Sequence, residues 1–438
     1  MLKNFKLLVS ILMLIGLVGL VPGTGTVFGA EKAPSQKPTK TRRVPTMSEQ
    51  TFKKLAEVQE AIDAKEWDQA VQVLKKLRQK KSLNPNEVGQ VENMYGYVYF
   101  SKGDYPDAIN HYLQVVAQGE KIPEGLETTT LYTLAQLYFV TDKYEKALEY
   151  MRKWLAKALN PGADPYIFMG QVYYQMKDFP NSTKMIEKGI AVARERGVPI
   201  KENWWQLLQY LYYEQENWDR VLDILQILVK DFPKRDYWVQ LAGVYGQQGY
   251  EKEQLYSMES AHVLGFLTRE QDILNFTGLL MQAEVPFRAA YYLAAAMKQG
   301  VVERTAKNLK MLGQAWQIAQ ETKKAIPVFE EAGKKSEDGE ILARLASLYL
   351  DNDDYPDCIK AANTALNKGG LKKPQSVHVV RGMCQFNTDR LTAARNSFSE
   401  ARRIARQKKD KSTESLTASW LTYIDREKIR REKLKESI

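Results

Sequence analysis

The chain has 438 residues, a formal net charge of +10, three histidines and two cysteines. None of the histidines has a histidine or cysteine partner at a metal-ligand spacing, and no glycine-rich phosphate loop, nucleophile elbow or HExxH motif occurs. The composition therefore excludes the common catalytic constellations, and we predict no enzyme, no metal site and no cofactor.

Residues 1–29 have the organisation of a secretory signal. Lys3 and Lys6 precede an apolar run from Leu7 to Val21, which a Pro- and Gly-containing stretch follows. The residues before Ala30 form a passable cleavage site. No charge occurs between Leu7 and Ala30, so an uncleaved membrane anchor is the alternative. Either form predicts export, to the periplasm of a Gram-negative bacterium, with inner-membrane anchoring if the signal stays.

Residues 30–50 are predicted to be a disordered, basic, Pro-rich tether. The stretch 31–46 is dominated by Pro, Lys and Thr, which cannot bury enough apolar surface to fold.

Residues 51–411 contain one pattern ten times, at intervals of 33 to 39 residues. Two clear copies run from Leu134 to Ala147 and from Leu345 to Cys358. In each copy a small residue is followed three positions later by Tyr, nine later by an aromatic residue, and twelve later by a second small residue. This is the skeleton of the tetratricopeptide repeat, whose period is about 34 residues. It predicts an all-α superhelical solenoid of about ten helix-turn-helix repeats with a C-terminal capping helix.

The small residues of the pattern are predicted to lie where the two helices of a repeat cross, because a large side chain there would push the helix axes apart. The first and sixth copies are degenerate, and in the sixth Tyr250 arrives one residue early, which predicts a shortened turn. The predicted crossing positions are Gly96, Ala108, Ala135, Ala147, Gly170, Gly278, Ala290, Gly313, Ala325, Ala346, Gly382 and Ala394.

Residues 412–438 are predicted to form a basic C-terminal helix. Residues 402–438 hold twelve basic and six acidic residues, residues 31–43 hold five and one, and the remainder is close to neutral. A solvated basic helix is one interpretation. Weak attraction of both basic ends to an anionic membrane surface is the other. Nucleic acid fits poorly with an exported chain.

The cysteines Cys358 and Cys384 fall in the ninth and tenth repeats. They are interpreted as small buried thiols or as a disulfide, which an oxidising compartment allows. Sequence spacing alone does not decide between the two.

A partner groove is predicted on the first helices of repeats two to five. Side chains one and four residues after the first small position, and three before it, share one helix face. They form a series of aromatic residues with interleaved amides, which suits an extended peptide. The set is Asn93, Tyr97, Phe100, Tyr132, Gln136, Phe139, Gln171, Tyr174, Gln206, Tyr210 and Tyr213. Packing of some of these tyrosines between repeats is the alternative.

Four stretches, Gly125–Leu155, Lys201–Tyr213, Tyr237–Gly246 and Lys307–Phe329, resemble a family of exported bacterial tetratricopeptide-repeat proteins described as putative components of the TonB system. TonB, with ExbB and ExbD, carries proton-motive energy to outer-membrane receptors for iron–siderophore cargo. The resemblance implies an accessory scaffold in that uptake, with these proteins or extended peptides as partners, and it implies no catalytic residue. The alternative is a scaffold or chaperone in envelope assembly, working with peptidoglycan or outer-membrane biogenesis machinery.

Overall fold

The computed structural model describes residues 42–436, and every regular element in that range is helical. The predicted signal at 1–29 and most of the tether lie outside the described residues. No helix between residues 42 and 436 has the length and apolar character that crossing a bilayer needs.

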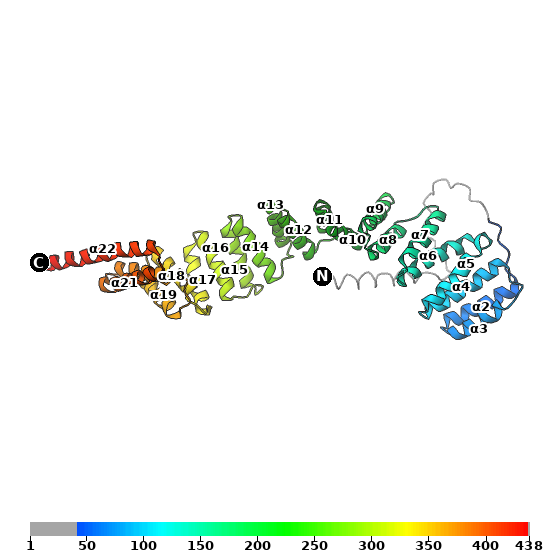
Figure 1. The fold of residues 1–438 in the computed structure, drawn as a ribbon, viewed down its shortest axis with the longest axis horizontal. Coiled ribbons are helices and arrows are strands. Elements are labelled where there is room, and N and C mark those ends of the chain that lie inside the picture. Colours follow the sequence, from blue (N-terminus) through cyan, green and yellow to red (C-terminus); the bar gives the residue numbers. More distant parts are fainter. Residues whose placement is uncertain (1–41, 437–438) are drawn as a thin grey trace. The chain divides into compact units, whose positions relative to one another are not determined.

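The chain divides into two compact units, with the boundary after Leu159. In the first unit, consecutive helices form three antiparallel hairpins (Figure 1). The helices are α2 (Glu49–Asp63), α3 (Trp67–Arg78), α4 (Pro85–Ser101), α5 (Tyr105–Val116), α6 (Glu124–Val140) and α7 (Tyr144–Lys157), with a short 3₁₀ helix η1 (Gly119–Lys121) before α6.

The second unit contains seven more hairpins and a final helix. Its first three hairpins are α8 (Asp164–Gln175) with α9 (Phe179–Glu195), α10 (Glu202–Glu214) with α11 (Trp218–Asp231), and α12 (Arg235–Gln247) with α13 (Glu251–Val263). The next two are α14 (Glu270–Gln282) with α15 (Pro286–Lys298) and α16 (Ala306–Ile318) with α17 (Thr322–Lys335). The last two are α18 (Glu340–Asp351) with α19 (Tyr355–Lys368) and α20 (Pro374–Asn387) with α21 (Leu391–Gln407), followed by α22 (Lys411–Glu436). The predicted ten repeats and capping helix are thus confirmed. Below, the first helix of each hairpin is called its A helix and the second its B helix.

Every turn between an A helix and its B helix has three residues, and its middle residue has a positive φ. Gly249 in the sixth repeat has φ 78°, and Asp353 in the ninth has φ 61°. A left-handed residue ends a helix by freeing the chain to reverse. The shortened turn predicted for the sixth repeat is therefore wrong. Tyr250 arrives early because it is the N-cap residue of α13, one position before the helix start where other repeats place their aromatic residue.

The two helices of a repeat cross so closely that only a small residue fits at the crossing. A Cβ added to Gly170 would lie 2.5 Å from the Ile186 side chain, and one added to Gly313 would lie 2.9 Å from the Phe329 ring. A Cβ added to Gly96 or to Gly382 would make comparably close contacts. The predicted alanines are all fully buried, namely Ala108, Ala135, Ala147, Ala290, Ala325, Ala346 and Ala394. The close approach of the helix axes in these hairpins thus depends on having glycine or alanine at the crossing, where a larger side chain would not fit.

The seventh repeat corrects one predicted crossing position. A Cβ added to Gly278 would meet no atom within 4 Å, whereas the preceding Thr277 is completely buried. In the other repeats the B helix begins nine residues after the first small position, and nine residues before Pro286 is Thr277. The motif register therefore runs one residue earlier here than predicted, because Thr277 faces α15 and Gly278 is rotated away from it.

The end of the tether is ordered, which corrects the predicted disorder for residues 42–50. Helix α2 begins at Glu49, and the extended residues before it contact α4 and α6. Asn86 Nδ2 donates to the Pro45 carbonyl at 2.9 Å, and Arg42 Nη1 lies 2.7 Å from the buried carboxylate of Glu127. The basic residue at this point is thus a structural partner of the third repeat.

Cys358 and Cys384 form a disulfide between α19 and α20, with their Cα atoms 6.4 Å apart. Cys358 occupies the second small position of the ninth repeat, and both residues are fully buried. The disulfide therefore links the B helix of one repeat to the A helix of the next.

Helix α22 closes the second unit. Trp420 stacks nearly parallel on the fully buried Phe398 of α21, with ring centroids 5.1 Å apart. Arg406 and Glu414 form an ion pair at 2.6 Å, and Arg431 pairs with Asp389 of the turn before α21. Part of the positive charge of residues 402–436 is therefore neutralised within the fold.

Candidate protein-interaction surface

In the first unit, the side chains predicted to line a groove differ widely in exposure. Tyr97 on α4 is 40% exposed, while Asn93 and Gln136 are half-buried. Tyr132 packs edge-on against Trp154 of α7, with centroids 5.3 Å apart. Phe139 is only 8% exposed, so it offers almost no surface to a partner. Of the aromatic residues predicted in this unit, Tyr97 presents the largest accessible face.

In the second unit, Tyr174 of α8 and Tyr210 of α10 belong to neighbouring A helices and meet edge to face, with centroids 5.7 Å apart. Both are half-buried. Burial, followed by a hydrogen bond to the Glu214 carboxylate, raises the pKa of Tyr210. Burial also raises the pKa of Tyr174, against a hydrogen bond with Tyr210 that lowers it. The two rings thus form an aromatic contact between the fourth and fifth repeats, and both tyrosine hydroxyls stay protonated at physiological pH.

The amide and the last tyrosine of α10 have different environments. Gln206 Nε2 donates to the hydroxyl of Tyr237 on the next A helix, so this amide is already used within the protein. Tyr213 is 50% exposed and packs edge-on against Trp218 of α11, with centroids 5.2 Å apart. Gln171 on α8 is half-buried.

A contact between two aromatic residues recurs in these repeats and explains why each A-helix ring is partly covered. The aromatic residue four positions after the first small residue contacts the aromatic residue that begins the B helix of its own repeat. The pairs are Phe100–Tyr105, Phe139–Tyr144, Tyr174–Phe179 and Tyr213–Trp218, with centroids 5.2 to 6.2 Å apart. These rings therefore brace the turn of each hairpin, and only the parts of them left exposed can bind a partner.

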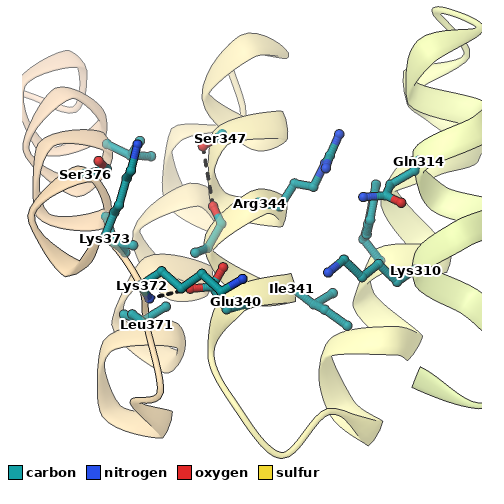
Figure 2. Close-up of a pocket in the computed structure, with 14 residues that line it drawn as sticks. Lys310, Gln314, Glu340, Ile341, Arg344, Ser347, Leu371, Lys372, Lys373 and Ser376 are labelled. Atoms are coloured by element: carbon teal, nitrogen blue, oxygen red, sulfur yellow. Dashed lines mark hydrogen bonds between the residues drawn. The ribbon is translucent and has the colours of Figure 1, made fainter. Parts of the chain in front are cut away.

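Sequence reasoning missed a second surface, a hollow of about 460 Å³ lined by residues of α16 and α18 and by the start of α20 (Figure 2). Its polar side chains include Lys310, Arg344, Lys372 and Lys373, with Glu340 as the carboxylate among them. The offsets used for repeats two to five, applied to repeat eight, would have selected Lys310, Gln314 and Gln317, and the first two of these line the hollow. Arg344 and the two lysines before α20 fall outside those offsets, so only the folded chain groups them.

No group of three potential metal ligands from His, Cys, Asp and Glu gathers within residues 42–436. The two surfaces described above consist mainly of aromatic, amide and cationic side chains, which are types that recognise protein segments.

Comparison with known families agrees with this architecture. Residues 87–159 match the family model described as tetratricopeptide repeat. Within residues 42–436 the regular structure is thus all helical and built from hairpins of the tetratricopeptide type. No curated protein matches the chain.

Several solved structures share the repeat architecture at low identity. A tetratricopeptide repeat protein from Parabacteroides merdae is 16% identical, covering 69% of this chain and 99% of its own, with a TM-score of 0.36. The C-terminal part of a TPR repeat-containing protein from Cytophaga hutchinsonii is also 16% identical, over 56% and 98%, with a TM-score of 0.35. The TPR2AB domain of yeast Sti1 in complex with pHSP90 is 10% identical, over 69% and 99%, with a TM-score of 0.26. At these TM-scores none of the three supports an inference about partner or activity.

Proposed function

We propose that this chain is an exported protein-interaction scaffold in the periplasm of a Gram-negative bacterium. It serves as an accessory component of TonB-dependent energy transduction and iron–siderophore uptake. Repeats of this type form scaffolds for protein–protein contacts. The particular machinery is supported by the resemblance of four stretches to the TonB-associated family, and export is supported by the signal pattern at residues 1–29.

The observation that carries the binding role is the exposure of aromatic rings on A helices. Tyr97 is 40% exposed in the first unit and Tyr213 is 50% exposed in the second. Half-buried amides accompany them, Asn93 on the same helix as Tyr97 and Gln171 on α8. Rigid aromatic faces beside amides can pack on apolar side chains and bond the backbone of an extended segment. Each unit provides its own part of this surface.

Alanine substitution tests the binding role. We expect Tyr97→Ala and Tyr210→Ala each to weaken partner binding by about 1–3 kcal/mol, the range of interface anchors. Gln136→Ala should cost about 1 kcal/mol, the net worth of one hydrogen bond. Tyr256→Ala is the matched control, because this tyrosine is 59% exposed but lies on the B helix α13. Equal binding by Tyr97→Ala and Tyr256→Ala would contradict the proposed surface.

Crosslinking in living cells tests the machinery. A photoreactive residue in place of Tyr97 or Tyr213 should capture TonB, ExbB or ExbD under iron limitation, with the same residue at Tyr256 as control. Capture of cell-wall synthases or barrel-assembly factors instead would support the envelope-assembly alternative. A deletion strain should grow slowly on a TonB-dependent siderophore, and a normal uptake rate in that strain would count against the TonB role.

A further inference from the structure

The connections between helices in the second unit differ in charge according to their type. The turns that join an A helix to its own B helix hold two basic and seven acidic residues, whereas the loops that join a B helix to the next A helix hold nine basic and four acidic residues. The turns are 176–178, 215–217, 248–250, 283–285, 319–321, 352–354 and 388–390, and the loops are 196–201, 232–234, 264–269, 299–305, 336–339, 369–373 and 408–410.

This difference separates charge across each hairpin. Because the A and B helices of a repeat run antiparallel, the turns lie at one end of the hairpins and the loops lie at the other. The turns together have a net charge of −5 and the loops a net charge of +5. The two ends of these repeats therefore attract opposite charges.

The last loops lie side by side. The Gly339 N–H donates to the Gly369 carbonyl at 2.8 Å, which joins the loop before α18 to the loop before α20. Lys408 Nζ donates to the Lys372 carbonyl at 2.9 Å, which joins the loop before α20 to the loop before α22. We call the exposed lysines of the last two loops and of the helix ends beside them the lysine edge, which consists of Lys368, Lys372, Lys373, Lys408, Lys409 and Lys411.

The six charges of the lysine edge are not neutralised by side chains of the fold. The ammonium groups of Lys368 and Lys408 donate to backbone carbonyls. None of the six forms an ion pair with a carboxylate in residues 42–436. The nearby carboxylates of Glu340 and Asp410 accept hydrogen bonds from backbone N–H groups instead. The lysine edge therefore presents its positive charge to the solvent.

Three of these lysines lie where the fold by itself disfavours a positive charge. Lys372 and Lys373 directly precede α20, and Lys411 is the first residue of α22. The N-terminus of a helix carries a partial positive charge, which repels cations. Helix α18 has Glu340 in its first turn, whereas α20 has no acidic residue there. Residues that break such a local rule are expected where an external partner is recognised.

The composition of the lysine edge favours a lipid surface over a protein partner. Its cations are all lysines, which are flexible point charges without the fixed fork of arginine. No large apolar side chain of residues 368–373 or 408–411 is exposed, so the aromatic or aliphatic anchors of a protein interface are missing there. A layer of phosphate headgroups needs no such anchor, because each lysine near it adds its own attraction.

We propose that the lysine edge docks this protein on an anionic lipid surface, with the acidic hairpin turns of the same repeats facing away from the lipid. The docking goes beyond the proposed scaffold role, which concerns protein partners bound on A helices. It is peripheral and electrostatic, so it weakens as salt screens the charges.

Vesicle flotation of residues 30–438 tests the docking without the apolar run of the predicted signal. The vesicles are phosphatidylcholine mixed with phosphatidylglycerol, and pure phosphatidylcholine is the neutral control. We expect binding to the mixed vesicles and none to the neutral ones. High salt should release the bound protein.

Two variants of equal net charge locate the contact. The edge variant combines Lys372→Gln, Lys373→Gln, Lys408→Gln and Lys409→Gln. The matched control combines Lys184→Gln, Lys252→Gln, Lys323→Gln and Lys360→Gln, which are exposed lysines of the B helices α9, α13, α17 and α19. The edge variant should bind mixed vesicles about tenfold or more weakly, since each lysine near the surface contributes separately. The control should bind as the wild type does, and equal unfolding midpoints verify that both variants fold.

Lipid crosslinking tests the orientation. A photoreactive residue in place of Ser412, in the first turn of α22, should crosslink to lipid in mixed vesicles. The same residue in place of Asn352, in the hairpin turn of the ninth repeat, should not. Both positions are exposed, so accessibility alone would label them equally.

Three results would overturn the proposal. One is equal binding of the wild type to mixed and neutral vesicles, or no binding to either at low salt. Another is equal affinity of the edge variant and the matched control for mixed vesicles. The third is equal lipid crosslinking from positions 412 and 352. None of these results bears on Tyr97 or Tyr213, so failure of the lipid docking is distinguishable from failure of the aromatic surface.

Discussion

Two consecutive repeats in the second unit carry a glycine where the sequence pattern predicts the first small position, and only one of these glycines lies in the helix crossing. In the eighth repeat, Gly313 lets α16 approach α17 so closely that a Cβ would lie 2.9 Å from the Phe329 ring. In the seventh, a Cβ on Gly278 would meet nothing within 4 Å, and the buried Thr277 faces α15 instead. A match to a repeat motif therefore identifies a hairpin reliably, but it does not identify which of two adjacent residues lies in the contact.

The largest expected effect extends the comparison to the ninth repeat, where Cys358 holds the position that Ala325 holds in the eighth. Cys358→Ala keeps a small residue there but removes the disulfide to Cys384, which closes a span of 26 residues. For a loop of that length we expect a loss of about 3 kcal/mol in unfolding free energy. Urea denaturation under oxidising conditions measures it. The wild type in excess reductant is the control, and it should fall to the level of the variant.

The second prediction tests the two glycines directly. Gly313→Leu should cost about 1–3 kcal/mol or more, because the added atoms overlap the Phe329 ring. Gly278→Leu, the matched control, should not destabilise the protein, because an added Cβ meets open space and leucine favours a helix more than glycine does. Hydrogen exchange of α14 to α17 would report both locally. Equal destabilisation by the two variants would show that Gly278 also lies in a crossing.

The third prediction concerns the residue that replaces Gly278 in the contact. Thr277 is completely buried, and its hydroxyl donates to the Ile273 carbonyl at 2.7 Å. Thr277→Leu should therefore cost about 1–2 kcal/mol by overpacking the approach of α14 to α15. Thr268→Leu, in the loop before α14, is the control for the chemical change. Tolerance of leucine at position 277 would contradict the shifted register.

The smallest expected effect has the opposite sign. Gly278 lies inside α14 with open space where a Cβ would be, so Gly278→Ala should stabilise the protein by about 0.5–1 kcal/mol through helix propensity alone. A rise in the midpoint of the same denaturation curves would confirm it. The same change at Gly313 should lower the midpoint, which completes the comparison.

The candidate surfaces show the same division between pattern and structure. The helix-face offsets found Tyr97 and Tyr213, which are exposed, but also Phe139, which is buried against Tyr144. The offsets could not reveal that Phe139 is buried, because the exposure of an A-helix ring depends on the neighbouring B helix. The cationic hollow escaped them because Arg344 and Lys373 stand at different offsets in their repeats, and only stacking of three A helices groups them.

The sequence by itself determined the number of hairpins, the places of their turns and most of the crossing positions. These follow from local rules, since a small residue, a left-handed turn residue and an apolar periodicity act within a single repeat. Only the tertiary structure decided the register of the seventh repeat, the pairing of Cys358 with Cys384, the contact of Arg42 with Glu127, and the group of unpaired cations around Arg344. Each of these depends on contacts between helices or segments, where side-chain rotation and packing set distances that residue spacing cannot supply.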